Sequence, residues 1–282
     1  MTRFQSMAAL SLVLSLIGLT GCEHKTTLDL DPLATDGRTG GAPDLKYPAI
    51  MHIADASRSA GDFANAIALY RHAATMEPKS ADPLTALGGT LLDMGKPDEA
   101  ITNYNAALKL SAHDQTALRG LAKAYLKTGR PDLAGGPLAI AYKDNPNDPK
   151  LLQLVGVADD FIGEHGNAQV RYQQGLRLAP ADHSLILDLS LSLALSEKFD
   201  EAINLMRPLA FATAATPEER QTLALIYGLK GDQKSAMQLA RMDLDTAAAN
   251  HNLAFYETLR RLPPEARSRA ILSASAVARP QS

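Results

Sequence analysis

Few residues of this chain stand at spacings that could support catalysis. Asp159 and Asp160 are adjacent carboxylates, which could act in acid–base chemistry or hold a metal ion. Neighbouring residues on a helix point about 100° apart, so these two would not converge on one substrate atom. We therefore expect Asp159 to lie at a helix edge or to pair with a nearby arginine such as Arg171.

The other sequence patterns typical of catalysis are missing. The seven histidines are scattered, and none belongs to an HExxH zinc motif. The sequence also lacks a GxSxG elbow, a Walker loop, a GxGxxG turn and cysteine pairs at metal-binding spacing. The formal net charge is -3, so no basic balance favours nucleic acid as a partner. We predict no catalytic residue, no metal site and no cofactor.

The single cysteine, Cys22, follows an apolar run of twelve residues at 8–19. This run is shorter than the roughly 20 residues that span a bilayer, but it has the length of a signal-peptide core. Because there is no second cysteine, a disulfide within the chain is impossible. Residues 19–22 read Leu-Thr-Gly-Cys, which resembles the bacterial lipoprotein signal box.

That resemblance implies that residues 1–21 are a signal peptide and that Cys22 is lipidated and becomes the first residue of the mature chain. The alternative is an ordinary secretory peptide, or a membrane anchor, with a chance cysteine. Glu23 follows the cysteine, where aspartate is the retention signal of the inner membrane in many bacteria. We therefore expect an outer-membrane lipoprotein facing the periplasm. Residues 22–46 are polar and rich in glycine and proline, so we predict a flexible tether there.

The rest of the chain is organised by a repeat of 34 residues without insertions. Six alanines recur at this interval: Ala66, Ala100, Ala134, Ala168, Ala202 and Ala236. Five of them have glycine five residues upstream, and Glu197 takes that place in the fifth unit. A fixed period of this length indicates a solenoid of helix pairs.

The pattern resembles the tetratricopeptide repeat (TPR) family, which has small residues at positions 8, 20 and 27 of each unit. With the alanines at position 20, six units follow: 47–80, 81–114, 115–148, 149–182, 183–216 and 217–248. The resemblance implies an all-α, right-handed solenoid of about six repeats. The sixth unit departs from the pattern, with Arg220 at the normally apolar position 4 and Asp243 at position 27.

Start and stop signals fall between the expected helices. Asp82-Pro83 and Asp148-Pro149 are typical of an N-cap followed by a first-turn proline, and Thr216 with Glu219 predicts a capping box. After the sixth unit, residues 250–262 form one more amphipathic segment. We expect residues 249–282 to be a capping helix followed by a basic tail.

In TPR solenoids the first helix of each unit lines the concave surface, at positions 2, 5, 9 and 12. Transferred to this chain, the resemblance implies a partner-binding face of Arg119, Lys123, Lys150, Gln153, Leu187 and Leu191, with Lys127 one residue beyond these positions. A basic stretch beside an apolar one would suit an extended or helical acidic segment of a partner protein.

Together these features predict a lipid-anchored periplasmic TPR scaffold for protein–protein interaction, and not an enzyme. The layout resembles the TadD lipoproteins of tight-adherence (Flp) pilus systems, which implies a pilotin-like role toward an outer-membrane secretin or another pilus-assembly component. Two alternatives stay open. One is an outer-membrane assembly or cell-wall-enzyme cofactor lipoprotein. The other is an envelope enzyme with a regulatory repeat array, although residues 23–46 and 249–282 show no catalytic cluster.

Overall fold

The computed structural model describes the backbone of residues 46–278 and the side chains of residues 46–272. The predicted signal peptide, Cys22 and the tether up to residue 45 lie outside the described residues, as do the last four residues. The described part consists of helices and connecting turns without a strand, which confirms the all-α class. None of its helices combines the length and apolar character needed to cross a membrane.

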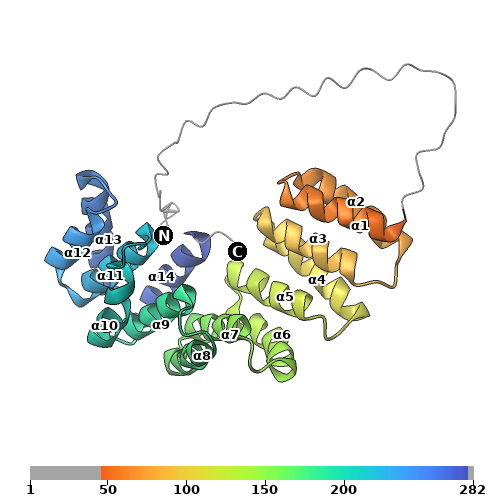
Figure 1. Ribbon diagram of the computed structural model, residues 1–282. Coiled ribbons are helices and arrows are strands. Elements are labelled where there is room, and N and C mark those ends of the chain that lie inside the picture. The colour runs from red at the N-terminus through yellow and green to blue at the C-terminus, as the bar shows by residue number, and fades with distance from the viewer. Residues whose placement is uncertain (1–45, 279–282) are drawn as a thin grey trace, which may run out of the picture. The chain divides into compact units, whose positions relative to one another are not determined.

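Twelve of the helices form six consecutive pairs, one in each 34-residue unit (Figure 1). The pairs are α1 Tyr47–Ser59 with α2 Phe63–Met76, α3 Asp82–Asp93 with α4 Pro97–Leu110, α5 Gln115–Lys127 with α6 Pro131–Asp144, α7 Pro149–Phe161 with α8 His165–Leu178, α9 His183–Leu195 with α10 Phe199–Ala210, and α11 Pro217–Lys230 with α12 Gln233–Ala240. Each of these helices packs against its neighbours along the chain, as in other helix-pair solenoids.

The helix starts follow the sequence signals with one exception. The Asp148 side chain caps α7 by accepting two backbone N–H groups, and Thr216 with Glu219 forms the predicted capping box of α11. Asp82, by contrast, does not cap α3. The helix begins at Asp82 itself, its N-cap is Ala81, and no side chain caps that end. The Asp82 carboxylate is therefore available to line a groove.

Position 15 of every unit has a positive φ angle, which ends the first helix and turns the chain into the second. Glycine occupies it in five units, with φ between 69° and 95°. Glycine adopts this conformation without steric cost because it has no Cβ. The fifth unit places Glu197 there at φ 62°, at a cost of roughly 1–2 kcal/mol for a residue with a side chain.

The recurring small residues are the points of closest helix approach. All six repeat alanines have no exposed surface. The tyrosine at position 24 of a unit fills the space above small residues of the neighbouring helices. A Cβ placed on Gly120 would lie 2.2 Å from Cζ of Tyr104, and one on Gly156 would lie 2.5 Å from Cε1 of Tyr172. Large side chains at these positions would push the helices apart.

The C-terminal end differs from the expectation of one helix and a tail. α13, Thr246–Arg261, packs on α11 and α12 and covers the last pair, with Tyr256 filling the space above Gly228. The expected basic tail is wrong, because Pro264–Ala278 form a further helix, α14. Proline ends α13 and is also well suited to the first turn of the next helix.

α14 does not continue the stack. It packs against α13 and also against α5, α7 and α9, which are the first helices of three consecutive units (Figure 1). The surface of α7 and α9 that was expected to receive a partner is therefore partly covered by the chain's own last helix.

Candidate partner-binding groove

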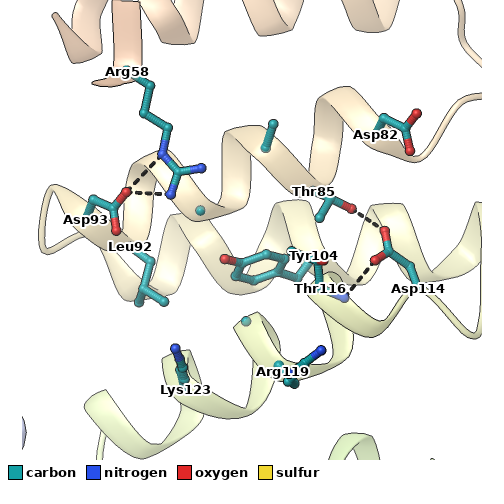
Figure 2. Close-up of a pocket in the computed structure, with 13 residues that line it drawn as sticks. Arg58, Asp82, Thr85, Leu92, Asp93, Tyr104, Asp114, Thr116, Arg119 and Lys123 are labelled. Atoms are coloured by element: carbon teal, nitrogen blue, oxygen red, sulfur yellow. Dashed lines mark hydrogen bonds and ion pairs between the residues drawn. The ribbon is translucent and has the colours of Figure 1, made fainter. Parts of the chain in front are cut away.

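A groove of about 650 Å³ lies on the first helices of the first three units. α3 and α5 supply most of its lining, Arg58 of α1 closes one end, and Tyr104 of α4 contributes from below (Figure 2). Thr85, Arg119 and Lys123 line it from positions 5 and 9 of their units. These are the positions that the repeat pattern assigns to the concave face.

Two glycines let neighbouring side chains form the groove floor. A Cβ on Gly89 would lie 3.0 Å from both terminal nitrogens of Arg58, so the guanidinium rests directly against the α3 backbone. Gly120 makes room for the Tyr104 ring in the same way. The Arg58 guanidinium at one end and the Tyr104 ring are therefore each held in place by the close approach of a helix backbone.

Hydrogen bonds hold two of the three acidic side chains of the groove, Asp93 and Asp114. Arg58 donates from Nε and Nη2 to Oδ2 of Asp93, at 3.0 and 2.6 Å. At the other end, Thr85 donates to Oδ2 of Asp114 at 2.7 Å, and Oδ1 of Asp114 caps α5 (Figure 2). Since these side chains are already paired, the groove is largely preformed for a ligand.

Lys123 is the exposed cation of this groove. It forms no ion pair with any residue that the structure describes. Desolvation in the groove, followed by the positive charges of Arg119, Lys127 and Lys150, lowers the pKa of Lys123 from its ordinary value, while the negative charge of Asp93 acts in the opposite direction. A partner carboxylate would relieve this repulsion between like charges, so Lys123 is the natural contact for an acidic side chain.

Arg119 also lines the groove, but its charge is already engaged. It donates from Nη1 to Oδ2 of Asp148 at 2.7 Å, and both side chains are about one-third exposed, at 32% and 27%. Lys127 is exposed on the last turn of α5 and does not line the groove. The expected basic stretch is therefore a groove of both signs, with three cationic and three acidic side chains.

The predicted residues of the fourth unit pair with the fifth. Lys150 lies 3.1 Å from a carboxylate oxygen of Asp182, and Gln153 donates to Asp188 at 2.6 Å. These contacts join successive first helices across the unit boundary. Neither Lys150 nor Gln153 lines the groove.

Leu187 and Leu191 were expected to be exposed on the concave face, and that expectation is wrong. Each is only 5% exposed. Both belong to the same buried apolar cluster as Ile271 and Leu272 of α14. α14 packs against α7 and α9, so these two leucines do not offer an exposed surface to a partner.

Asp160 is the centre of a buried polar network that the sequence did not reveal. It is 1% exposed. One oxygen lies 2.7 Å from Nδ1 of His165 and accepts from Ser192 at 2.7 Å, and the other accepts from the Tyr172 hydroxyl at 2.9 Å. Burial raises the pKa of Asp160, while the hydrogen bonds from His165, Ser192 and Tyr172 act in the opposite direction.

The network extends to α14, since Nε2 of His165 lies 3.1 Å from Oγ of Ser268. Aspartate, histidine and serine are thus connected in the order of a hydrolytic triad. Ser268 is only 4% exposed, however, and does not line the groove described above. The network joins four helices, α7, α8, α9 and α14.

Asp159 points elsewhere, as expected for neighbours on a helix. It forms no ion pair with Arg171 in the described part of the chain. The Arg171 guanidinium lies over the Tyr142 ring, 4.8 Å from its centroid, and donates to the Tyr142 hydroxyl. Burial raises the pKa of Asp159, and the positive charge of Arg171 opposes that shift.

Within the residues whose side chains are described, no three histidine, cysteine or acidic side chains gather closely enough to hold a metal ion.

Two family models described as tetratricopeptide repeat match the chain, over residues 57–102 and 85–149. The sequence matches none of the curated proteins with which it was compared. Among solved structures, a TPR protein from Parabacteroides merdae has a TM-score of 0.65 at 18% identity, covering 82% of this chain and 92% of its own.

Two further structures share the fold. Pseudomonas aeruginosa pilF has a TM-score of 0.60 at 18% identity, covering 74% of this chain and 97% of its own. YrrB, described as a TPR protein with an unusual peptide-binding site, has a TM-score of 0.51 at 18% identity, covering 64% and 96%. Residues 57–149 thus match tetratricopeptide repeat models, and the helix pairs have the fold of solved TPR structures.

Proposed function

We propose that this protein is a scaffold that binds a segment of a partner protein in the groove on α1, α3 and α5. The observation that carries the proposal is a preformed groove with one exposed cation, Lys123, that lacks an ion-pair partner among the described residues. TPR folds bind protein partners in general, and the peptide-binding site named for YrrB supports a peptide as the ligand.

The groove favours an extended or helical segment with an acidic side chain directed at Lys123. At one end, Arg58 can donate further hydrogen bonds to a partner's polar groups, and Asp93 can accept them. Because the lining carries equal numbers of both charges, long-range attraction is weak. Specificity would therefore come from the local pattern of charges on the partner.

The binding experiment reverses one charge and leaves the fold's own pairs intact. Lys123→Glu places a carboxylate where the partner's acidic residue would sit. We expect recovery of envelope proteins in a pull-down from detergent-solubilised membranes to fall by about tenfold. Arg119→Glu is a poorer test, since it would also repel Asp148 and disturb the cap of α7.

The matched control is Lys234→Glu, which makes the same charge change on an exposed residue of α12 outside the groove. It should leave the pull-down unchanged, and both variants should keep the circular dichroism and melting of the original protein. If Lys123→Glu folds normally and recovers the same partners in the same amounts, the groove is not the binding site.

We also propose that the scaffold is anchored to the outer membrane through a lipid on Cys22. The support is the Leu-Thr-Gly-Cys sequence at residues 19–22 after an apolar run. Cys22→Ser should move the protein from the membrane fraction to the soluble periplasmic fraction. A variant that still sediments with membranes after a high-salt wash would contradict the lipid anchor.

The machine we propose for this scaffold is a Tad/Flp-type pilus secretion system. The support is the resemblance of the layout to TadD lipoproteins and the fold shared with Pseudomonas aeruginosa pilF. Deletion of the gene in a host with such a system should abolish surface pili, and re-expression should restore them. Normal piliation in the deletion strain, together with a cell-wall or outer-membrane assembly defect, would favour the alternative lipoprotein role.

A further inference from the structure

α14 lies across the first helices of the third, fourth and fifth units instead of extending the stack (Figure 1). Its side chains Arg267, Ser268, Ile271 and Leu272 are all at most 9% exposed. α14, a short helix that follows a proline break, thus occupies a surface formed by the first helices of the same chain.

The contacts of α14 combine an apolar pair with two polar contacts. Ile271 and Leu272 join Leu187 and Leu191 of α9 in one buried cluster. Arg267 donates to a carboxylate oxygen of Glu197 at 3.1 Å, and Ser268 meets Nε2 of His165 at 3.1 Å. Grooves that bind an amphipathic helix recognise it by the same combination of buried apolar anchors and polar contacts.

Glu197 breaks the repeat pattern at the point where the array forms an ion pair with α14, and its side chain is 62% exposed. The other five units have glycine at position 15, where φ is positive. Only the fifth unit has a side chain there, in spite of the strained backbone, and that side chain holds Arg267. The residue that breaks the repeat pattern is the one that binds α14.

We propose that the concave surface of α7 and α9 is a second docking surface, for an amphipathic helix of a partner, and that α14 is its resident occupant. The partner helix would carry the chemistry that α14 presents: an arginine and a small hydroxyl residue, followed about one turn later by two adjacent aliphatic residues. Such a helix competes with α14, so the surface is exposed only when α14 is displaced. This surface is separate from the groove that contains Lys123.

The probe for this proposal is a fluorescent synthetic peptide with the sequence of residues 263–278, added to the full chain with Cys22→Ser. The unaltered surface should bind it weakly, because α14 is already there. The double variant Ile271→Ser with Leu272→Ser weakens the resident helix and should bind the peptide at least about tenfold more tightly. A peptide carrying the same two serines is the matched control and should not bind.

A charge exchange tests the register of the contact. Glu197→Arg alone and Arg267→Glu alone should each release α14. The Arg267→Glu protein keeps Glu197, so it should bind the peptide with residues 263–278 more tightly than the original protein does. The protein with both changes should return to weak binding, because the ion pair is rebuilt in reverse. Circular dichroism of each variant establishes that the repeats are folded.

Equal affinity of the peptide for the original protein and for the Ile271→Ser, Leu272→Ser variant would overturn the proposal, as would no binding to either. Lys123→Glu should leave peptide affinity unchanged. A failure of this experiment therefore differs from a failure of the Lys123 groove.

Discussion

Arg220 and Asp243 form an ion pair from two departures of the sixth unit from the repeat pattern. Arg220 stands at position 4, which is apolar in the other units, and Asp243 at position 27, which is normally small. Nε of Arg220 donates to both carboxylate oxygens at 3.0 and 2.9 Å, and the two side chains are 17% and 10% exposed. Each of the two charged side chains is therefore neutralised by the other in the fold.

This pair predicts a stability that depends on acid pH. The hydrogen bonds from Arg220 hold the pKa of Asp243 below its ordinary value. A carboxylate with a depressed pKa stabilises the fold above the ordinary pKa and loses that effect as the pH falls through the folded pKa. Asp243→Asn should cost about 1–3 kcal/mol at pH 7, measured by urea unfolding, because the partly buried Arg220 loses its partner.

The difference between Asp243→Asn and the original protein should shrink when the unfolding is repeated near pH 3. Asp200→Asn is the control, since Asp200 pairs with Lys230 but its side chain is 82% exposed. Exposed pairs contribute about 0–1 kcal/mol, so this variant should change little at either pH. Equal losses for both aspartates would show that burial of the Arg220 pair is unimportant.

Substitutions at Gly129, Ala134 and Gly135 of the third unit should change the stability of the fold differently. Gly135 lies inside α6 with open space where a Cβ would go, so Gly135→Ala should stabilise by about 0.5–1 kcal/mol. Ala134 has no exposed surface, and Ala134→Leu should overpack and cost about 1–3 kcal/mol. Gly129→Ala, at φ 69°, should cost roughly 1–2 kcal/mol in spite of open space. Chemical denaturation of the three variants measures their free energies of unfolding and tests this order.

Gly120 and Tyr104 should be energetically coupled. Gly120→Ala places a Cβ 2.2 Å from the Tyr104 ring and should cost about 1–3 kcal/mol, because the ring must move. In a Tyr104→Leu background the same change should cost less by at least about 0.5 kcal/mol. A double-mutant cycle by urea unfolding measures this difference, and strict additivity would mean that the ring does not occupy the space above Gly120.

Glu197 should separate backbone strain from side-chain contact. Glu197→Gly removes both the strain and the Arg267 contact, whereas Glu197→Ala keeps the strain and loses the contact. The alanine variant should therefore be less stable than the glycine variant by roughly 1–2 kcal/mol in thermal or urea unfolding. Equal stability of the two would indicate that the backbone at residue 197 relaxes without cost.

Much of the fold was predictable because the information is local and repeated. A small residue every 34 positions, with a breaker five residues before it, determines where each helix pair turns, and each unit supplies the same evidence again. The lining of the groove by Arg119 and Lys123 follows from the same period, once the first helices are known to share a face.

The parts that could not be predicted depend on contacts distant in sequence. Ile271 and Leu272 are two aliphatic residues in an arginine-bearing segment, and no local period connects them with Leu187 and Leu191. One indication was present, however. α9 is apolar on nearly every side, and a helix of that kind is buried all round, so something had to cover its concave face.

The contact between His165 and Ser268 joins residues 103 positions apart in the chain. The early units need only short-range contacts and can fold as they leave the ribosome, whereas the covered face of α9 waits for the last residues to be synthesised. Leu187 and Leu191 are therefore exposed apolar surface during every round of synthesis. Docking of α14 then buries this apolar surface.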